Sequence, residues 1–107
     1  MTAEEVLGKR YRLGDVIGRG GMGEVFVAVD LELRREVAVK RLRRDPTERT
    51  VARFEREARV QSRLDHPAIP PVYQLGVDDR GQPYFAMKRL AGVTMGSIAD
   101  QNGDGAR

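Results

Sequence analysis

Short stretches in which apolar residues alternate with polar ones predict most of the secondary structure of this 107-residue chain. In residues 24–30, Val25, Val27 and Val29 recur with the period of two that is typical of a half-buried β-strand. Four further strands are predicted at residues 11–18, around 37–40, at 72–77 and at 84–90. Polar turns at residues 31–35 and 78–83 separate the strands, so we expect an antiparallel sheet.

One long helix is predicted between the strand around residue 40 and the last two strands. Asp45 is the expected N-cap, with Pro46 at the first helical position and Glu48 three residues after the cap. The helix is expected to run to about Leu64, because residues 65–67 read Asp-His-Pro and stop it. The predicted fold class is therefore α+β, with a five-stranded antiparallel sheet and one long helix.

The predicted helix has an apolar side with a carboxylate in it. On a helical wheel, Phe54, Val60 and Leu64 fall within about 60° of Glu57. Glu57 is therefore expected in the middle of the arc that faces the core. A carboxylate in that position is costly unless a cation pairs with it.

Lys40 is the predicted partner of Glu57, because it stands inside an otherwise apolar strand. Two alternatives stay open on the pattern alone. Arg53 lies near the same arc one turn earlier and could take the place of Lys40. Glu57 could also be an ordinary solvated charge on the helix surface.

A glycine-rich segment marks a candidate phosphate site. Gly18, Gly20 and Gly23 form the pattern G-x-G-x-x-G, and a backbone without Cβ atoms can fold closely over phosphates. Lys40 could reach the same phosphates as a mobile point charge. A dinucleotide fingerprint would need a helix here, and a Walker-type loop would need Lys and Ser or Thr, but the strand at 24–30 follows instead. A glycine-rich hairpin without a ligand would explain the glycines but not Lys40.

Five ordered motifs resemble the N-terminal lobe of a protein kinase, most closely the bacterial serine/threonine type. The motifs are residues 18–25, 37–40, 54–58, 64–69 and 83–87. The resemblance covers about residues 9–99. It implies that residues 1–92 form the N-lobe and that residues 93–107 are the truncated start of the C-lobe, expected to be a disordered tail.

The resemblance implies a site for ATP, with Mg²⁺ as its companion ion. The glycine loop would cover the phosphates, Lys40 would hold the α- and β-phosphates, and Glu57 would hold Lys40. Val25 and Ala38 would cover the adenine, Met87 would control the back of the pocket, and the backbone of 88–91 would bind the adenine edge. The implied ATP-binding residues are Ile17, Gly18, Arg19, Gly20, Gly21, Met22, Gly23, Glu24, Val25, Ala38, Lys40, Met87, Lys88 and Leu90.

The parts that carry out phosphoryl transfer do not occur in the 107 residues. A kinase of this type uses an H-R-D-x-x-x-x-N loop and a D-F-G segment, and His66, the one histidine, is followed by Pro67. We therefore predict no catalytic and no metal-ligating residue in this chain and expect it to be inactive alone. Two functions stay open: the ATP-binding piece of a longer serine/threonine kinase, or a non-catalytic nucleotide- or partner-binding module.

Composition limits the partners. The net charge of +3 comes with a basic face, but no nucleic-acid motif accompanies it, so nucleic acid is an unlikely partner. The expected partners are ATP, a protein substrate of the complete kinase, another kinase or a second copy. The absence of cysteine, an acidic N-terminus and the lack of an apolar run of about 20 residues favour a cytoplasmic protein. Residues 100–105 match only the first half of a calcium loop, so calcium is not expected.

Overall fold

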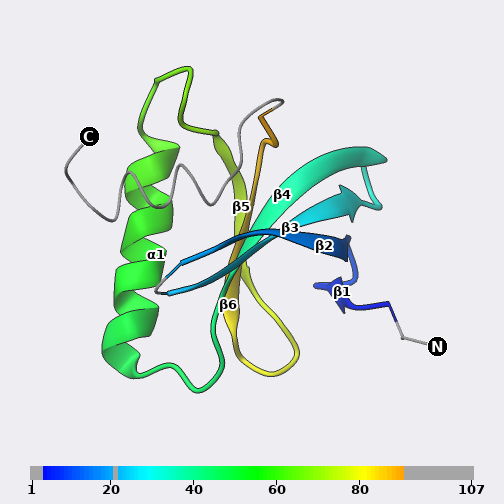
Figure 1. Ribbon diagram of the computed structural model, residues 1–107. Helices are drawn as coiled ribbons and strands as arrows, with labels where there is room; N and C mark the ends of the chain where they lie inside the picture. The colour runs from blue at the N-terminus through cyan, green and yellow to red at the C-terminus, as the bar shows by residue number, and fades with distance from the viewer. Residues whose placement is uncertain (1–3, 21, 91–107) are drawn as a thin grey trace.

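The computed structural model describes residues 4–20 and 22–90. Within these residues one sheet has the order β1-β2-β3-β4-β6-β5, and every neighbouring pair is antiparallel. The helix α1 lies along one side of this curled sheet (Figure 1). The elements are β1 (Val6–Leu7), β2 (Tyr11–Arg19), β3 (Gly23–Asp30), β4 (Arg35–Leu42), α1 (Glu48–Ser62), β5 (Val72–Val77) and β6 (Pro83–Met87).

The predicted α+β class is confirmed, and β2 to β6 correspond to the five predicted strands. The short β1 is an addition, which pairs Val6 with Arg12 and Leu7 with Tyr11. Several boundaries differ from the prediction. Arg35 and Pro83 already belong to β4 and β6 rather than to the preceding turns. β2 runs to Arg19 rather than Gly18, and β6 ends at Met87 rather than at Leu90.

Both faces of the sheet are apolar, and β4 contributes to both because its side chains alternate. Ala38 and Leu42 pack in the cluster on the α1 side, while Val37 and Val39 pack in the cluster on the opposite side. These four side chains are all buried. The same alternation places Lys40, between Ala38 and Leu42, on the α1 side of the sheet.

The start of α1 corrects the sequence prediction. Thr47, not Asp45, is the N-cap: its backbone is extended, and its Oγ1 accepts from Thr50 N at 3.1 Å. Asp45 has a φ of 55°, in the left-handed region, and precedes Pro46 in the loop. Threonine is also a favoured N-cap residue, and Thr47, two positions after Asp45, therefore caps α1. At the other end α1 stops at Ser62, two residues before the predicted Leu64.

The buried side of α1 also differs from the prediction. Phe54 and Ala58 are buried against the sheet, with the Phe54 ring 5.2 Å from that of Phe85. Val60 and Leu64, expected in the core, are 49% and 46% exposed. The contact with the sheet is centred on Phe54 and Ala58, so Glu57 lies at the flank of the apolar side rather than in its middle.

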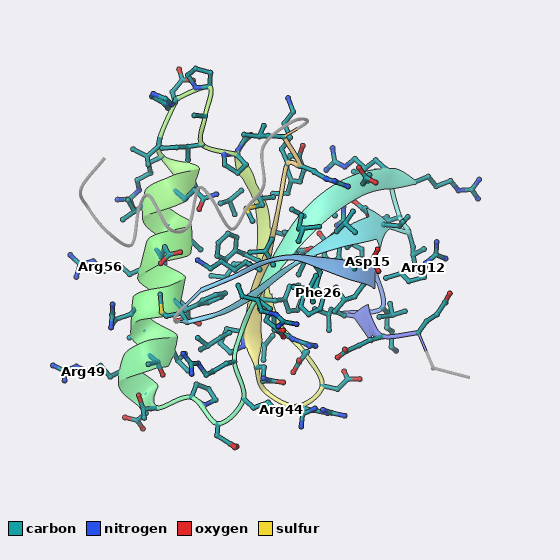
Figure 2. The ribbon with its side chains drawn as sticks, viewed as in Figure 1. Arg12, Asp15, Phe26, Arg44, Arg49 and Arg56 are labelled. Atoms are coloured by element: carbon teal, nitrogen blue, oxygen red, sulfur yellow. The ribbon has the colours of Figure 1, made fainter. Side chains whose placement is uncertain are left out.

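The outer side of α1 is strongly basic. Figure 2 shows Arg49 and Arg56 pointing from the helix away from the sheet. Arg53, Arg59 and Arg63 are exposed as well. These exposed arginines match a basic face that is solvated, which is a simpler interpretation than a nucleic-acid interface. Among the described residues no helix is long and apolar enough to span a membrane.

Candidate functional site

The glycine-rich segment forms the turn between β2 and β3, as the strand pattern predicted. Gly18 pairs with Val25 and Arg19 with Glu24 across the two strands, and Gly20 N donates to Gly23 O at 2.9 Å. Arg19 Nε and Glu24 Oε2 form an exposed ion pair at 3.4 Å. Gly21, one of the predicted site residues, lies outside the described residues.

Two glycines of this turn have different surroundings. A Cβ on Gly23 would lie 2.0 Å from the carbonyl oxygen of Arg41, because β4 passes directly beside it. A Cβ on Gly20 would meet no atom of the residues that the structure describes within 4 Å. The fold therefore requires glycine at position 23, whereas the described residues leave free space beside Gly20. A backbone with free space beside it can be approached closely by a ligand.

Lys40 and Glu57 form an ion pair that joins the sheet to α1. Lys40 Nζ donates to Glu57 Oε1 at 2.5 Å. The Lys40 side chain is 14% exposed and the Glu57 side chain 39% exposed, so the pair lies at the edge of the core and not inside it. Lys40 is held in place on the sheet by Val25 of β3 and Phe85 of β6, its neighbours in register.

The apolar residues predicted around a nucleotide gather on the same face of the sheet. Val25, Ala38 and Met87 belong to the buried cluster on the α1 side, and Ala38 and Met87 are paired in register between β4 and β6. Ile17, Met22 and Leu90 are partly buried and pack against this cluster. The Lys40 ammonium group and this apolar cluster thus lie on one face of the sheet, next to the strand that follows the glycine turn.

Lys88 lies just after β6, and its side chain is exposed. Its backbone N–H donates to Pro71 O at 3.0 Å, which ties the end of β6 to the residue before β5. This N–H is therefore already used within the protein.

Gln61 is part of this region, and the sequence pattern did not single it out. It lies one turn after Glu57 on α1, and its Nε2 donates to Pro70 O at 2.8 Å and lies 3.5 Å from Met87 Sδ. Pro70 and Met87 are both buried, so the amide satisfies a backbone carbonyl that water does not reach easily. The sequence did contain a signal for Gln61: it is a polar residue on the apolar side of the helical wheel, four positions after Glu57.

The described residues contain no group of three His, Asp or Glu side chains that could hold a metal ion. Arg53, the alternative partner of Glu57, forms no ion pair with any residue in 4–20 or 22–90. Among the described residues, Lys40 is therefore the cation that pairs with Glu57.

Known proteins match both the sequence and the fold. The family model described as protein tyrosine and serine/threonine kinase matches residues 11–102. The serine/threonine-protein kinase PknB of Mycolicibacterium smegmatis is 44% identical over 96% of this chain and 17% of its own length. A probable serine/threonine-protein kinase of Streptomyces coelicolor is 49% identical over 83% of this chain and 14% of its own length.

A solved structure agrees with these relatives. The kinase domain of PknI from Mycobacterium tuberculosis superposes with a TM-score of 0.63 and 28% identity, over 87% of this chain and 38% of that domain. The chain thus spans less than a fifth of the length of these two curated relatives and less than half of a solved kinase domain. The predicted resemblance to bacterial serine/threonine kinases is confirmed. This chain belongs to the protein tyrosine and serine/threonine kinase family.

Proposed function

We propose that this chain is the ATP-binding part of a serine/threonine protein kinase, an enzyme that transfers the γ-phosphoryl group of ATP to hydroxyl groups of proteins. The observation that carries the proposal is the Lys40–Glu57 ion pair at 2.5 Å, in which Lys40 lies in register with Val25, two residues after the last glycine of the turn. A lysine on the sheet, fixed by a helix carboxylate, is the arrangement that positions the α- and β-phosphates in kinases.

The phosphates would lie between the glycine turn and Lys40. The free space beside Gly20 would let the backbone approach phosphate oxygens, while Gly23 keeps the root of the turn against β4. Lys40 carries its charge on a flexible stem, and Glu57 limits the positions that this charge samples. Lys40 would bind the phosphates and Glu57 would orient Lys40, and neither residue would transfer a proton.

The adenine would lie against the apolar surface of the same face. Ile17, Val25 and Ala38 would cover the ring from the sheet, and Met87 would close the back of the pocket. Lys88 and Leu90 would offer backbone groups to the ring edge. Ligand sites of this kind are mostly apolar with a few polar groups that fix orientation.

Mg²⁺ would neutralise charge on the phosphates when it is bound with ATP. Since the described residues provide no cluster of metal ligands, we propose that its ligands belong to the second lobe of the complete kinase. The group that accepts the substrate proton would lie there as well. We therefore expect no phosphoryl transfer by residues 1–107 alone.

The test is the dissociation constant of ATP with Mg²⁺ for the chain 1–107, measured by calorimetry beside Lys40→Met. The matched control is Lys9→Met, since Lys9 is exposed and lies before β2, outside the proposed site. Wherever ATP binds, to the chain alone or to the chain joined to a kinase C-lobe, the proposal expects Lys40→Met to weaken binding at least about tenfold, a loss of about 1.4 kcal/mol, and Lys9→Met to leave it unchanged. Equal affinity in both variants would contradict the assigned role of Lys40.

The non-catalytic alternative makes a different prediction in the same experiment. Tight nucleotide binding by the isolated chain would favour a nucleotide-binding module that works without a second lobe. Binding that appears only when a kinase C-lobe is joined to the chain would favour the catalytic piece, because the lobe then completes the site.

A further inference from the structure

A concave region lies away from the glycine turn, between the loop that joins β4 to α1 and the turn that joins β5 to β6. It is a hollow of about 340 Å³, within the size range of small-ligand sites. Its lining residues are Arg44, Asp45 and Pro46 from the loop and Arg80, Gly81 and Gln82 from the turn. Figure 2 labels Arg44 at this end of the molecule, near the start of α1.

The wall formed by the β5–β6 turn is fixed by its own hydrogen bonds. Asp78 Oδ1 accepts from the backbone N–H groups of Arg80 and Gln82, both at 2.9 Å. Gly81 N donates to Asp78 O at 3.0 Å, and Gly81 adopts a φ of 83°, which only glycine takes up easily. The backbone that carries Arg80 is therefore held in one conformation.

The floor connects this turn to the sheet. The Gln82 side chain is buried, and its Nε2 donates to Leu42 O at 3.2 Å. Leu42 is the last residue of β4, and Arg44 follows it by two positions. This bond sets the spacing between the two walls, so Arg44 and Arg80 belong to a hollow with a built floor rather than to two independent loops.

The hollow has an excess of positive charge. Arg44 and Arg80 approach it from opposite walls, and neither forms an ion pair with a residue of the described ranges. Asp45 is the one carboxylate among the lining residues, and it can balance only one of the two guanidinium groups. An anion would therefore remove an uncompensated charge.

We propose that this hollow binds a phosphoryl group through Arg44 and Arg80. A phosphoryl group carries a charge of about −1.5 to −2 near neutral pH and three acceptor oxygens. Guanidinium forks match phosphate oxygens in a bidentate manner, which a point charge such as lysine does not. A singly charged carboxylate fits less well, because Asp45 already supplies one. The group can come from free phosphate or from a phosphorylated side chain of a protein segment.

The test is a titration of the isotope-labelled chain 1–107, followed by the backbone amide signals of residues 44, 45, 47 and 80–82. The probes are inorganic phosphate, a short phosphothreonine peptide and the same peptide without phosphate. We expect saturable shifts of these signals with both phosphate-bearing probes, and none with the unphosphorylated peptide. Binding at least about tenfold tighter for the phosphopeptide than for phosphate would assign the site to a phosphorylated segment, and equal binding would assign it to free phosphate.

Three variants make the assignment specific. Arg44→Gln and Arg80→Gln should each weaken binding at least about fivefold, because each removes one charge-assisted contact. Arg56→Gln is the matched control, since Arg56 is exposed on α1 and does not line the hollow. An equal loss in Arg56→Gln would mean general charge attraction, and the absence of saturable shifts would mean no site; either result overturns the proposal.

Lys40→Met separates this proposal from ATP binding. Phosphate that binds at the glycine turn would be lost in Lys40→Met and kept in Arg80→Gln, which would overturn the hollow as the site. Phosphate binding that is kept in Lys40→Met and lost in Arg80→Gln supports the hollow as the site. The hollow does not depend on the proposed nucleotide site, so either proposal can fail while the other holds.

Discussion

Glu57 Oε1 accepts a hydrogen bond from Lys40 Nζ at 2.5 Å, although the Glu57 side chain is 39% exposed and that of Lys40 only 14%. The Glu57 carboxylate is therefore more exposed to solvent than the Lys40 side chain. Pairs that water reaches contribute about 0 to 1 kcal/mol to stability. The pair is better placed to orient the Lys40 ammonium than to hold α1 on the sheet.

The first prediction follows from this difference. Glu57→Gln should change the free energy of unfolding by no more than about 1 kcal/mol, because the amide keeps the shape and the helix keeps Phe54 and Ala58 in the core. The same change should weaken ATP binding about tenfold, since the ammonium is no longer held. Chemical denaturation and calorimetry measure the two quantities on one preparation.

Glu55→Gln is the control for this prediction. Glu55 lies on the same helix and meets Arg59 only at 4.0 Å, so its loss should change neither quantity appreciably. If Glu57→Gln unfolded the chain while Glu55→Gln did not, the ion pair would be structural, and the orienting role would be wrong.

The second prediction concerns two glycines of one turn. Gly23→Ala should destabilise the fold by about 2 kcal/mol or more, because its Cβ would lie 2.0 Å from the Arg41 carbonyl oxygen. Gly20→Ala should change stability by no more than about 0.5 kcal/mol, since no atom in the described part of the chain lies within 4 Å of the added Cβ. Thermal melts of the two variants give the comparison.

A ligand measurement extends the comparison. If a nucleotide lies beside Gly20, the stable Gly20→Ala variant should bind ATP more weakly than the unchanged chain. A variant that is stable and binds ATP with unchanged affinity would show that the backbone at position 20 does not approach the phosphates.

The strands were predictable because alternating apolar residues are typical of a strand, although the alternation did not show which face is buried. Of Val25, Val27 and Val29 on one side of β3, only Val25 is buried, in the cluster on the α1 side, and Phe26 and Ala28 on the other side are buried as well. The pairing of Lys40 with Glu57 was predictable for a similar reason: a charge inside an apolar pattern needs a partner. Both inferences depend on local pattern and on the cost of burying a charge.

Other features depend on tertiary contacts that a local pattern does not contain. The wheel shows that Val60 and Leu64 share a side with Glu57, but not which side meets the sheet, and both are largely exposed. The two-residue β1 is too short for a period to appear. The bond from Gln61 to Pro70 joins two segments whose approach is set by the packing of α1.

The third prediction tests the start of α1. Thr47→Ala should destabilise the chain by about 1 kcal/mol, because the Thr50 N–H loses its side-chain acceptor. Asp45→Asn is the control, since asparagine tolerates the left-handed backbone at this position and Asp45 does not cap the helix. Unchanged stability in Thr47→Ala would mean that Thr47 does not cap the helix.

The last prediction concerns Asp30, a buried carboxylate at the end of β3. Its side chain is 1% exposed, and Arg10 donates to it twice, from Nε to Oδ1 and from Nη2 to Oδ2, each at 2.9 Å. The backbone N–H groups of Glu32 and Leu33 donate to Oδ1 as well. The Arg10 hydrogen bonds lower the pKa of Asp30 from 3.8 to about 2, against the effect of its burial.

The sign of the pH effect follows from that lowered pKa. The folded state favours the ionised carboxylate, so Asp30 contributes its full stabilisation above the pKa of the unfolded chain, near 4. This contribution is lost as the pH falls through the folded pKa of about 2. Denaturation midpoints measured between about pH 5 and pH 2 should therefore fall with decreasing pH.

Asp30→Asn isolates the contribution of this one group. The variant should be less stable by about 2 kcal/mol at neutral pH, because Arg10 loses a charged partner while the amide oxygen still accepts from the turn. Its stability should also depend less on pH below 4 than that of the unchanged chain. Asp15→Asn, at an exposed aspartate of β2, should leave both the stability and the acid dependence as they were. If the acid dependence were identical in Asp30→Asn and the unchanged chain, another carboxylate would be responsible for the acid unfolding, and the ion pair with Arg10 would not set it.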